Sequence, residues 1–268
     1  MNNTILYTYD FEEGGIADFI KFLIHTIRIV NCNSYNLCID ILHPIKKYIA
    51  INEKYIRKKL TFYKISHNDK NLSIVDIVER QNYVNVNSLC YYAYGLKNNI
   101  TDIDFHNETN YDINIYDYLT FNVHIDNFFN NYIVIHIRFG DSFLENKVDL
   151  PYIDKRNIKE NYIEIIKNIL DKNEKTLLVT DNNLKKREIF NNFIEYKNLS
   201  YFDEEIVNIS FKFDDDFINS IEYDKLLINT IIDFLYLINS KEIHAISYSG
   251  FSIISHYISK NKLIKYYN

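Results

Sequence analysis

The most constraining feature of this chain is the apolar run YIVIHIR at residues 132–138, which ends in Phe139-Gly140-Asp141. A short run of this kind predicts a buried strand, and the Gly-Asp step predicts where the strand ends. Because side chains alternate across a strand, His136 and Arg138 fall on the same face. Arginine presents a rigid fork of N–H donors that matches phosphate oxygens. The pattern therefore predicts an anion-binding group at the carboxyl end of a strand, where α/β sheets usually bind ligands.

Strands and helices alternate through the second half of the chain. The apolar patterns predict strands at 132–138, 176–180, 199–202, 242–246 and 263–267, with helices at 158–170, at 223–238 and from near Phe251. This alternation implies a parallel sheet with right-handed crossover connections.

The first half opens with a strand at 4–9, a loop with two glycines at 10–15 and a helix at 16–30, which is the first unit of an α/β domain. Further strands are expected at 36–41, 61–66 and 73–78, with a short helix starting at Pro44. Residues 98–117 are polar and predict loops. We place the boundary between two lobes near residue 125.

Composition narrows the function classes. With 47% hydrophobic residues among 268, the chain can bury a large core, and a formal net charge of −6 argues against binding to a nucleic-acid backbone. The cysteines, Cys32, Cys38 and Cys90, lack zinc-site spacing and fit a reducing compartment. There is no secretory leader pattern and no run of about 18 apolar residues, so we expect a cytoplasmic protein without a membrane span.

Two other strand ends carry polar groups, at Thr180-Asp181 and at Ser247-Tyr248-Ser249-Gly250. Serine and glycine at a helix N-terminus offer hydroxyls and backbone N–H groups to an anion. Together with Arg138 they predict a diphosphate site that needs no metal, while Asp181 or Asp233 would accept hydrogen bonds from a base or ribose. The simpler interpretation, that Ser247 and Asp181 only cap helices, stays open.

The combination of these segments resembles a known family. The motif HIRFGD at 136–141 resembles the His-x-Arg-x-Gly-Asp motif of GDP-fucose-dependent fucosyltransferases, and SYSGFSII at 247–254 is similar to the Ser-Asn-Ser-Ser-Phe-Ser-Trp-Trp segment of the alpha-1,2 group. Weaker similarities follow in the same order along the chain, in EGGIAD at 13–18, LLVTDN at 177–182 and DFLYL at 233–237. Residues 40–125 match no segment of the family.

The resemblance implies an α/β, GT-B-like fold, with two Rossmann-type lobes of parallel sheets and a cleft between the lobes. Residues 1–125 would form the acceptor-side lobe and residues 126–268 the nucleotide-sugar-binding lobe. The implied activity is that of a metal-independent glycosyltransferase, which moves fucose from GDP-fucose to a sugar hydroxyl of a glycan with inversion, in alpha-1,2 linkage. No cofactor is implied beyond the donor substrate, and the implied partners are the nucleotide sugar and the glycan acceptor.

The resemblance also assigns residues. The implied donor-binding residues are Gly14, Gly15, His136, Arg138, Gly140, Asp141, Asp181, Asp233, Ser247, Ser249, Gly250, Phe251 and Ser252. Arg138 would neutralise charge on the GDP leaving group, because a preorganised cation stabilises charge that develops in the transition state. The candidates for a general base are Glu13, Asp18 and Glu145, with Asp18 preferred because its loop faces the interlobe cleft in this fold.

Other functions stay open at this point. Phe139 stands where the family commonly has a second arginine, and Asp18 stands where it has asparagine. These differences suit a transferase for another GDP-sugar, or a non-catalytic glycan-binding or structural protein that keeps the fold. A metal-dependent transferase would instead use carboxylates such as Asp102 and Asp104, or the run at 214–216, although solvated loop acids are the simpler interpretation.

Overall fold

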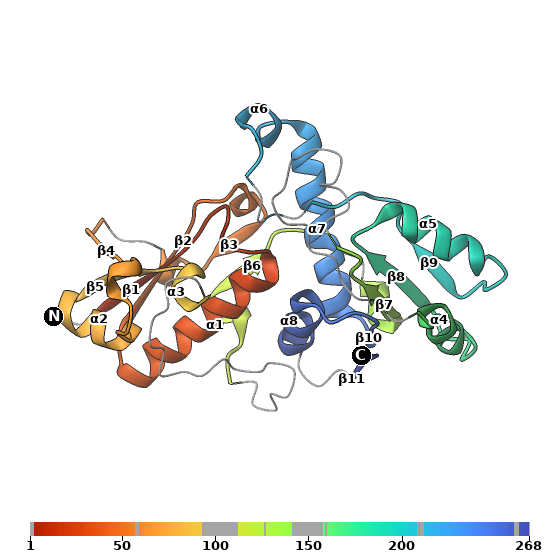
Figure 1. The fold of residues 1–268 in the computed structure, drawn as a ribbon, viewed down its shortest axis with the longest axis horizontal. Coiled ribbons are helices and arrows are strands. Elements are labelled where there is room, and N and C mark those ends of the chain that lie inside the picture. Colours follow the sequence, from red (N-terminus) through yellow and green to blue (C-terminus); the bar gives the residue numbers. More distant parts are fainter. Residues whose placement is uncertain are drawn as a thin grey trace. The chain divides into compact units, whose positions relative to one another are not determined.

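The computed structural model describes residues 3–56, 59–92, 112–125, 127–140, 158, 160–207, 209, 212–259 and 263–267. The chain divides into two compact units (Figure 1). The first comprises Met1–Asn122 and Ile209–Asp214, and the second comprises Val123–Asn208 and Asp215–Asn268. Each unit contains a parallel sheet with helices, which confirms the predicted α/β class with Rossmann-like domains.

The first unit is built on a four-stranded parallel sheet in the order β2-β1-β5-β4. Its strands are β1 (Thr4–Tyr9), β2 (Asn36–Ile41), β4 (Tyr63–Lys64) and β5 (Tyr83–Val86), and its α-helices are α1 (Ile16–Asn33), α2 (Ile74–Gln81) and α3 (Leu89–Tyr92). The smaller elements are β3 (Ile49–Ile51), paired antiparallel with β6 (Leu119–Phe121), and the 3-10 helices η1 (Pro44–Lys47), η2 (Glu53–Tyr55), η3 (His67–Asp69) and η4 (Ile115–Asp117). Every residue of β1 is buried, as expected for a central strand covered on both faces.

The second unit has a five-stranded parallel sheet in the order β11-β10-β7-β8-β9. Its strands are β7 (Ile133–Ile137), β8 (Thr176–Thr180), β9 (Leu199–Tyr201), β10 (Glu242–Ala245) and β11 (Leu263–Tyr266). Its helices are η5 (Asn127–Asn131), α4 (Tyr162–Leu170), α5 (Asn183–Asn192), α6 (Asp215–Ile218), α7 (Ile221–Asn239) and α8 (Gly250–Ser259). Numbered along the chain, the strands stand in the spatial order 3-2-1-4-5, which is the order of a Rossmann-type sheet.

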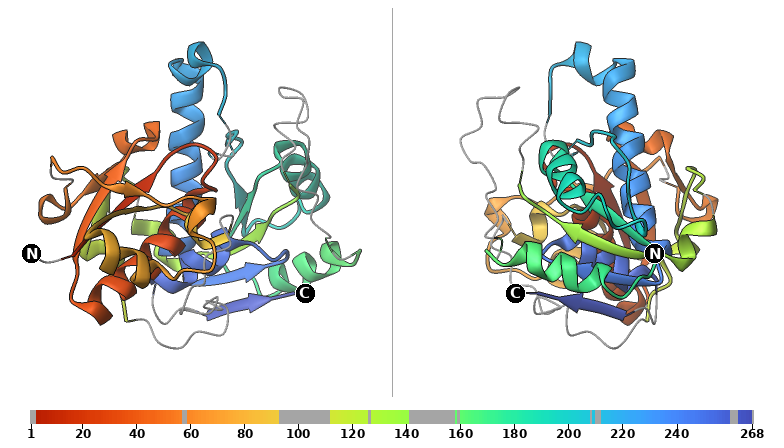
Figure 2. Two further views of the ribbon diagram at one scale, coloured as in Figure 1. Left: turned by 60° about the vertical axis from the view of Figure 1, so that its left-hand side comes forward. Right: turned by 90° about the vertical axis from the view of Figure 1, so that its right-hand side faces the viewer.

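Strand alternation distributes the core of the second unit over both faces of this sheet. Ile133, Ile135 and Ile137 of β7 pack in one cluster with residues of α4 and α5. Val134, with residues of β8, packs in a second cluster against α7. Figures 1 and 2 show the corresponding helices on opposite sides of the sheet. Coverage on both faces explains why the sequence of β7 is continuously apolar.

Most predicted elements are confirmed within a few residues, but the strand predicted at 73–78 is wrong, because this segment lies in helix α2. The Ser73 hydroxyl accepts a hydrogen bond from the Asp76 N–H at 3.0 Å, and the Asp76 carboxylate accepts one from the Ser73 N–H, also at 3.0 Å. This capping box starts a helix whose buried residues, Ile74, Ile77 and Val78, have helical spacing. Strands β3, β5 and β6 were not predicted.

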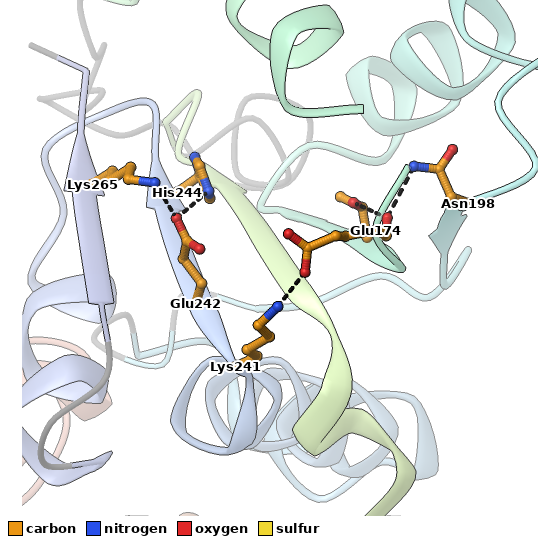
Figure 3. A network of polar contacts seen from close by, with 7 residues as sticks. Glu174, Asn198, Lys241, Glu242, His244 and Lys265 are labelled. Atoms are coloured by element: carbon orange, nitrogen blue, oxygen red, sulfur yellow. Dashed lines mark hydrogen bonds and ion pairs between the residues drawn. The ribbon is translucent and has the colours of Figure 1, made fainter. Parts of the chain in front are cut away.

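A polar network attaches the edge strand β11 to β10 (Figure 3). Lys265 Nζ donates to Glu242 Oε1 at 2.6 Å, and His244 Nε2 lies 2.8 Å from the same oxygen, although its N–H is poorly aligned. The other ring nitrogen of His244 lies 2.6 Å from the Tyr267 hydroxyl. Burial lowers the pKa of His244 to about 4, so its ring is neutral near neutral pH. Two contacts therefore join β10 to the chain of β11, from Glu242 to Lys265 and from His244 to Tyr267.

We expect Glu242→Ala to lower the free energy of unfolding by about 2 kcal/mol, because it removes the charged acceptor of Lys265 and the carboxylate beside the buried His244 ring. Burial opposes the charged form of Glu242, but the hydrogen bond from Lys265 holds its pKa below the ordinary value. The stabilisation is therefore present above that ordinary pKa and lost as the pH falls through the lowered folded-state value. Urea unfolding at neutral and acidic pH measures both effects.

The matched control is Glu174→Ala, which removes the other carboxylate that holds a lysine in Figure 3, Lys241. Both side chains of that pair are more than one-third exposed, so this variant should lose less than about 1 kcal/mol. Equal losses in the two variants would contradict the special role of Glu242.

Candidate functional site

The candidate site of the second unit lies at the carboxyl ends of β7, β8 and β10. Strand order reverses between β7 and β10, which are neighbours in the sheet although they are far apart in sequence. Ligands of doubly wound sheets bind at such a switch point, since the connections leave the two strands toward opposite faces. The segments that follow these strands, at 138–140, 181–182 and 246–252, are those in which the sequence predicted groups that bind a ligand.

Two side chains from neighbouring strand ends hold the backbone of the loop at 138–140. The Ser247 hydroxyl accepts a hydrogen bond from the Arg138 N–H at 2.6 Å. The Asp181 carboxylate accepts two, from the Phe139 N–H at 2.7 Å and from the Gly140 N–H at 2.9 Å. Gly140 has a φ of 116°, a conformation that favours glycine. The three predicted segments therefore meet, and Asp181 and Ser247 position the loop that carries Arg138.

This arrangement changes the interpretation of Asp181. The sequence offered it as an acceptor for a base or ribose, or as a helix cap. In the structure each carboxylate oxygen already accepts a backbone N–H of the Arg138 loop, while Asn182 caps α5 by accepting from the Lys185 N–H at 3.0 Å. A direct contact between Asp181 and a nucleotide stays a prediction.

We expect Asp181→Ala to lower the free energy of unfolding by about 2 kcal/mol, because two backbone N–H groups lose a charged acceptor. Asp181→Asn retains one acceptor oxygen and should lose about half as much. Chemical denaturation measures both. Asp171→Ala is the control, since the Asp171 carboxylate pairs with Lys167 and Tyr196 on the exposed surface, and its loss should have a much smaller effect. A loss no larger than the control's would contradict the positioning role.

His136 is buried beneath the start of α8. Its Nδ1 lies 2.5 Å from the Ser252 hydroxyl, and its ring stacks on Phe251 with centroids 5.6 Å apart. Burial, with a smaller contribution from the Arg138 cation, lowers the pKa of His136 to about 3. The ring is therefore neutral near neutral pH. In the described structure it attaches α8 to β7 and adds no positive charge to the site.

Helix α8 begins beside the Arg138 loop. The Ser249 hydroxyl accepts from the Phe251 N–H at 3.2 Å, and Ser247, Ser249 and Ser252 are all buried. Gly250, the first helical residue, is exposed. The first turn of any helix carries N–H groups without intrahelical acceptors and a partial positive charge, which suits an anion. The hydroxyls of Ser247 and Ser252 mainly hold this helix start against β7.

Asp233 lies in α7 and is only 6% exposed. Its Oδ2 atom is buried and has no hydrogen-bond partner among the described residues. Burial raises the pKa of Asp233 to about 6, against the opposing effect of the Lys186 cation. Lys186 is itself 1% exposed and donates to the carbonyl oxygens of Phe202, at 3.0 Å, and Glu204, at 3.4 Å. A buried carboxylate oxygen without a donor is costly, so Asp233 indicates a place for a ligand donor. Lys186 was not identified from the sequence as a neighbour of Asp233.

The predicted residues of the first unit lie in the loop between β1 and α1 and in the first turn of α1. Gly14 has a φ of 91°, and an added Cβ would lie 2.7 Å from the Asp18 side chain. Asp18 accepts from the Gly15 N–H at 3.3 Å and from Lys21 Nζ at 3.2 Å, so it acts as a helix cap with a surface ion pair. Its assignment as the general base stays a prediction.

Glu13 differs sharply from Asp18 because it is only 6% exposed. Its carboxylate accepts from the Asp10 N–H at 3.1 Å and from Asn87 Nδ2 at 2.6 Å. Burial, only partly offset by these hydrogen bonds, raises the pKa of Glu13 to about 7. Asn87 follows β5 and was not identified from the sequence. Asn87 directly follows a strand adjacent to β1, and this position is the feature from which it could have been predicted.

Some predicted site residues lie outside the described residues, namely Asp141, Glu145, Asp102 and Asp104. Within the described part of the chain, no group of three His, Cys, Asp or Glu residues is placed to hold a metal ion, and this includes the run at 214–216. In the same part, no helix combines the length and the apolar character that crossing a membrane requires.

Comparison with models of protein families and with curated proteins finds no match for this chain.

Proposed function

We propose that the second unit binds GDP-fucose and that the protein transfers fucose to a hydroxyl of a glycan, with inversion and in alpha-1,2 linkage. The observation that carries this proposal is the junction at the β7–β10 switch point. There the loop of Arg138 is held by Ser247 and Asp181, next to the first turn of α8. A cation and a helix N-terminus at one sheet edge suit a diphosphate.

In the proposed reaction, an acceptor oxygen attacks the anomeric carbon of fucose while the bond from that carbon to the GDP oxygen breaks. Negative charge then develops on the β-phosphate of the leaving group. The Arg138 guanidinium would stabilise this charge, and the first turn of α8 would add its partial positive charge. Ser247, Ser252, His136 and Asp181 would act as positioning residues, since they hold these two elements together.

The base of the nucleotide has a candidate partner in Asp233. Guanine presents two adjacent N–H groups on its Watson–Crick edge, and a carboxylate can accept hydrogen bonds from both. The Asp233 oxygen that has no donor among the described residues supports this role. Adenine, uracil and cytosine lack the pair of N–H groups on neighbouring ring positions, so such a contact would favour guanosine nucleotides.

The GT-B-like arrangement, with an acceptor-side lobe facing a donor-side lobe across a cleft, is part of this proposal. The proposal also includes a general base, which takes the proton from the acceptor hydroxyl. Glu13 suits proton abstraction better than Asp18, because a pKa of about 7 lies near the pH at which a general base works best. Asp18 is engaged as a helix cap and in an ion pair.

A second candidate is a protein that binds the nucleotide sugar without transferring it. Phe139 favours it, because this side chain packs on the apolar core with its ring 6.0 Å from that of Tyr162. The position at which the family has its second arginine is thus occupied here by a phenylalanine that packs on the core. Transferases that use another GDP-sugar stay open as a third candidate.

One experiment separates these candidates. Calorimetric titration with GDP, UDP, GDP-fucose and GDP-mannose should show binding of the guanosine compounds and preference for GDP-fucose. Release of GDP in the presence of a glycan acceptor, unchanged by EDTA, would support metal-independent transfer. Binding without GDP release would support the second candidate, and absence of GDP binding at millimolar concentration would contradict all three.

A further inference from the structure

A cavity of about 590 Å³ lies in the first unit, at the edge of its sheet opposite to the Glu13 loop. Its lining includes Thr4, Asn36 and Tyr83, which are the first residues of β1, β2 and β5. The cavity therefore lies at the amino ends of the parallel strands, whereas Glu13 and Asn87 follow the carboxyl ends of β1 and β5. A volume of this size is typical of small-ligand sites in proteins.

Tyrosines dominate the wall of this cavity. Four of its twelve lining residues are tyrosines, Tyr35, Tyr55, Tyr83 and Tyr118, whereas the whole chain has 24 tyrosines in 268 residues. The enrichment therefore exceeds what the composition alone would give. All four are half-buried, so each presents part of a ring and is held in place by the remainder.

The contacts of these rings preorganise the wall. Tyr55 and Tyr118 stack with their centroids 4.8 Å apart and an angle of 26° between their planes. Lys54 Nζ lies 5.1 Å from the centroid of Tyr55, and Tyr83 makes an edge contact with Phe62 at 6.1 Å. Rings that are already fixed lose little conformational entropy when a ligand packs on them.

The remaining lining defines the chemistry of a ligand. Asn31 and Asn36 supply exposed amide groups, which both donate and accept hydrogen bonds. Among the described residues that line the cavity there is no carboxylate, and Lys54 is the one cation. A metal ion would need several anionic oxygen ligands, and a polyanion would need several cations. Flat rings with amides and hydroxyls instead suit a neutral molecule that has apolar C–H faces and many hydroxyls.

We propose that this cavity is a binding site for a neutral carbohydrate, separate from the strand-end site of the same sheet. A pyranose would pack a C–H face on the Tyr55 ring and hydrogen-bond to Asn31 and Asn36. The site does not depend on the proposed transferase activity. A protein that binds glycans without acting on them could use it equally.

The test is saturation-transfer NMR and calorimetry on the full chain, with neutral methyl hexopyranosides and β-linked disaccharides as probes. We expect at least one saccharide to bind in the millimolar range, and Tyr55→Ala to weaken its binding about tenfold. Tyr55→Phe keeps the ring and should bind nearly as well as the wild type. Tyr63→Ala is the matched control, because it removes a tyrosine of the same unit that lies outside the cavity.

Asn36→Ala provides a second variant if Tyr55→Ala unfolds, since the Asn36 side chain is exposed; it should weaken the same saccharide severalfold. The proposal is overturned if no saccharide binds, or if binding survives both substitutions in folded protein. It is also overturned if nucleoside monophosphates bind to the cavity more tightly than every saccharide. The GDP titration of the second unit is a separate measurement, so failure of the transferase proposal leaves this test unaffected.

Discussion

Arg138→Ala should lower the rate of GDP release from GDP-fucose by at least about 100-fold, because it removes the cation proposed to stabilise the leaving group. The fold should survive. Ser247 bonds to the backbone N–H of Arg138 and Asp181 bonds to those of Phe139 and Gly140, so the loop is attached without the Arg138 guanidinium. The measurement is a GDP-release assay, with thermal unfolding as the check on folding.

Two further variants test whether the effect is specific to the Arg138 guanidinium. Arg138→Lys keeps a positive charge but loses the planar fork of donors, so its rate should lie between those of the wild type and the alanine variant. Arg187→Ala removes an exposed arginine of the same unit, paired with Asp203 at 2.7 Å, and should leave the rate unchanged. Undiminished turnover in folded Arg138→Ala protein would rule out the assigned role.

Asp233→Asn should weaken GDP binding at least about tenfold and at the same time stabilise the protein near neutral pH. Burial raises the folded-state pKa of Asp233 from its ordinary value of 3.8 to about 6. A carboxyl whose pKa rises on folding contributes least stability above its folded-state pKa, where the charge must be buried. Asparagine carries no charge, so the variant avoids this cost, which a shift of about two pKa units sets at roughly 3 kcal/mol.

The difference in stability between the wild type and Asp233→Asn should depend on pH. Below about pH 4 both the folded and the unfolded wild type hold the proton on Asp233, so the two proteins should differ little. As the pH rises through about 6, the wild type loses stability relative to the variant. Loss of the attraction to Lys186 opposes the gain, and we expect a net stabilisation of about 1–2 kcal/mol at pH 8.

Urea unfolding between pH 4 and pH 8, together with calorimetric titration of GDP, measures both effects of Asp233→Asn. The control is Glu195→Gln, an exposed carboxyl of the same unit, which should change neither stability nor GDP binding. If Asp233→Asn binds GDP as the wild type does, the carboxylate has no role in nucleotide recognition. If the Asp233→Asn variant is less stable than the wild type at pH 8, burial of the Asp233 charge does not lower the free energy of unfolding.

Local patterns were sufficient for much of the fold. Each strand of the second unit was predicted within two residues, since continuous apolar runs bounded by turn residues are a local signal. Helix α1 was predicted for the same reason. The strand predicted at 73–78 was wrong because a short run, SIVDIV, fits either period, and the Ser73–Asp76 capping box decides for the helix. Strand β5 has only four residues, which are too few for an alternating apolar pattern to be recognised.

Local sequence patterns were enough to place three polar strand ends, at 138–141, 180–181 and 247–252, at one edge of a parallel sheet. Strand direction and strand ends follow from local apolar periodicity, and the carboxyl ends of parallel strands share an edge. The contacts that each of these side chains makes could not be read from those patterns. In the structure Asp181 accepts from two backbone N–H groups, burial keeps His136 neutral, and one oxygen of Asp233 has no donor among the described residues. Burial and hydrogen-bond partners depend on which distant segments meet, and no local pattern contains that information.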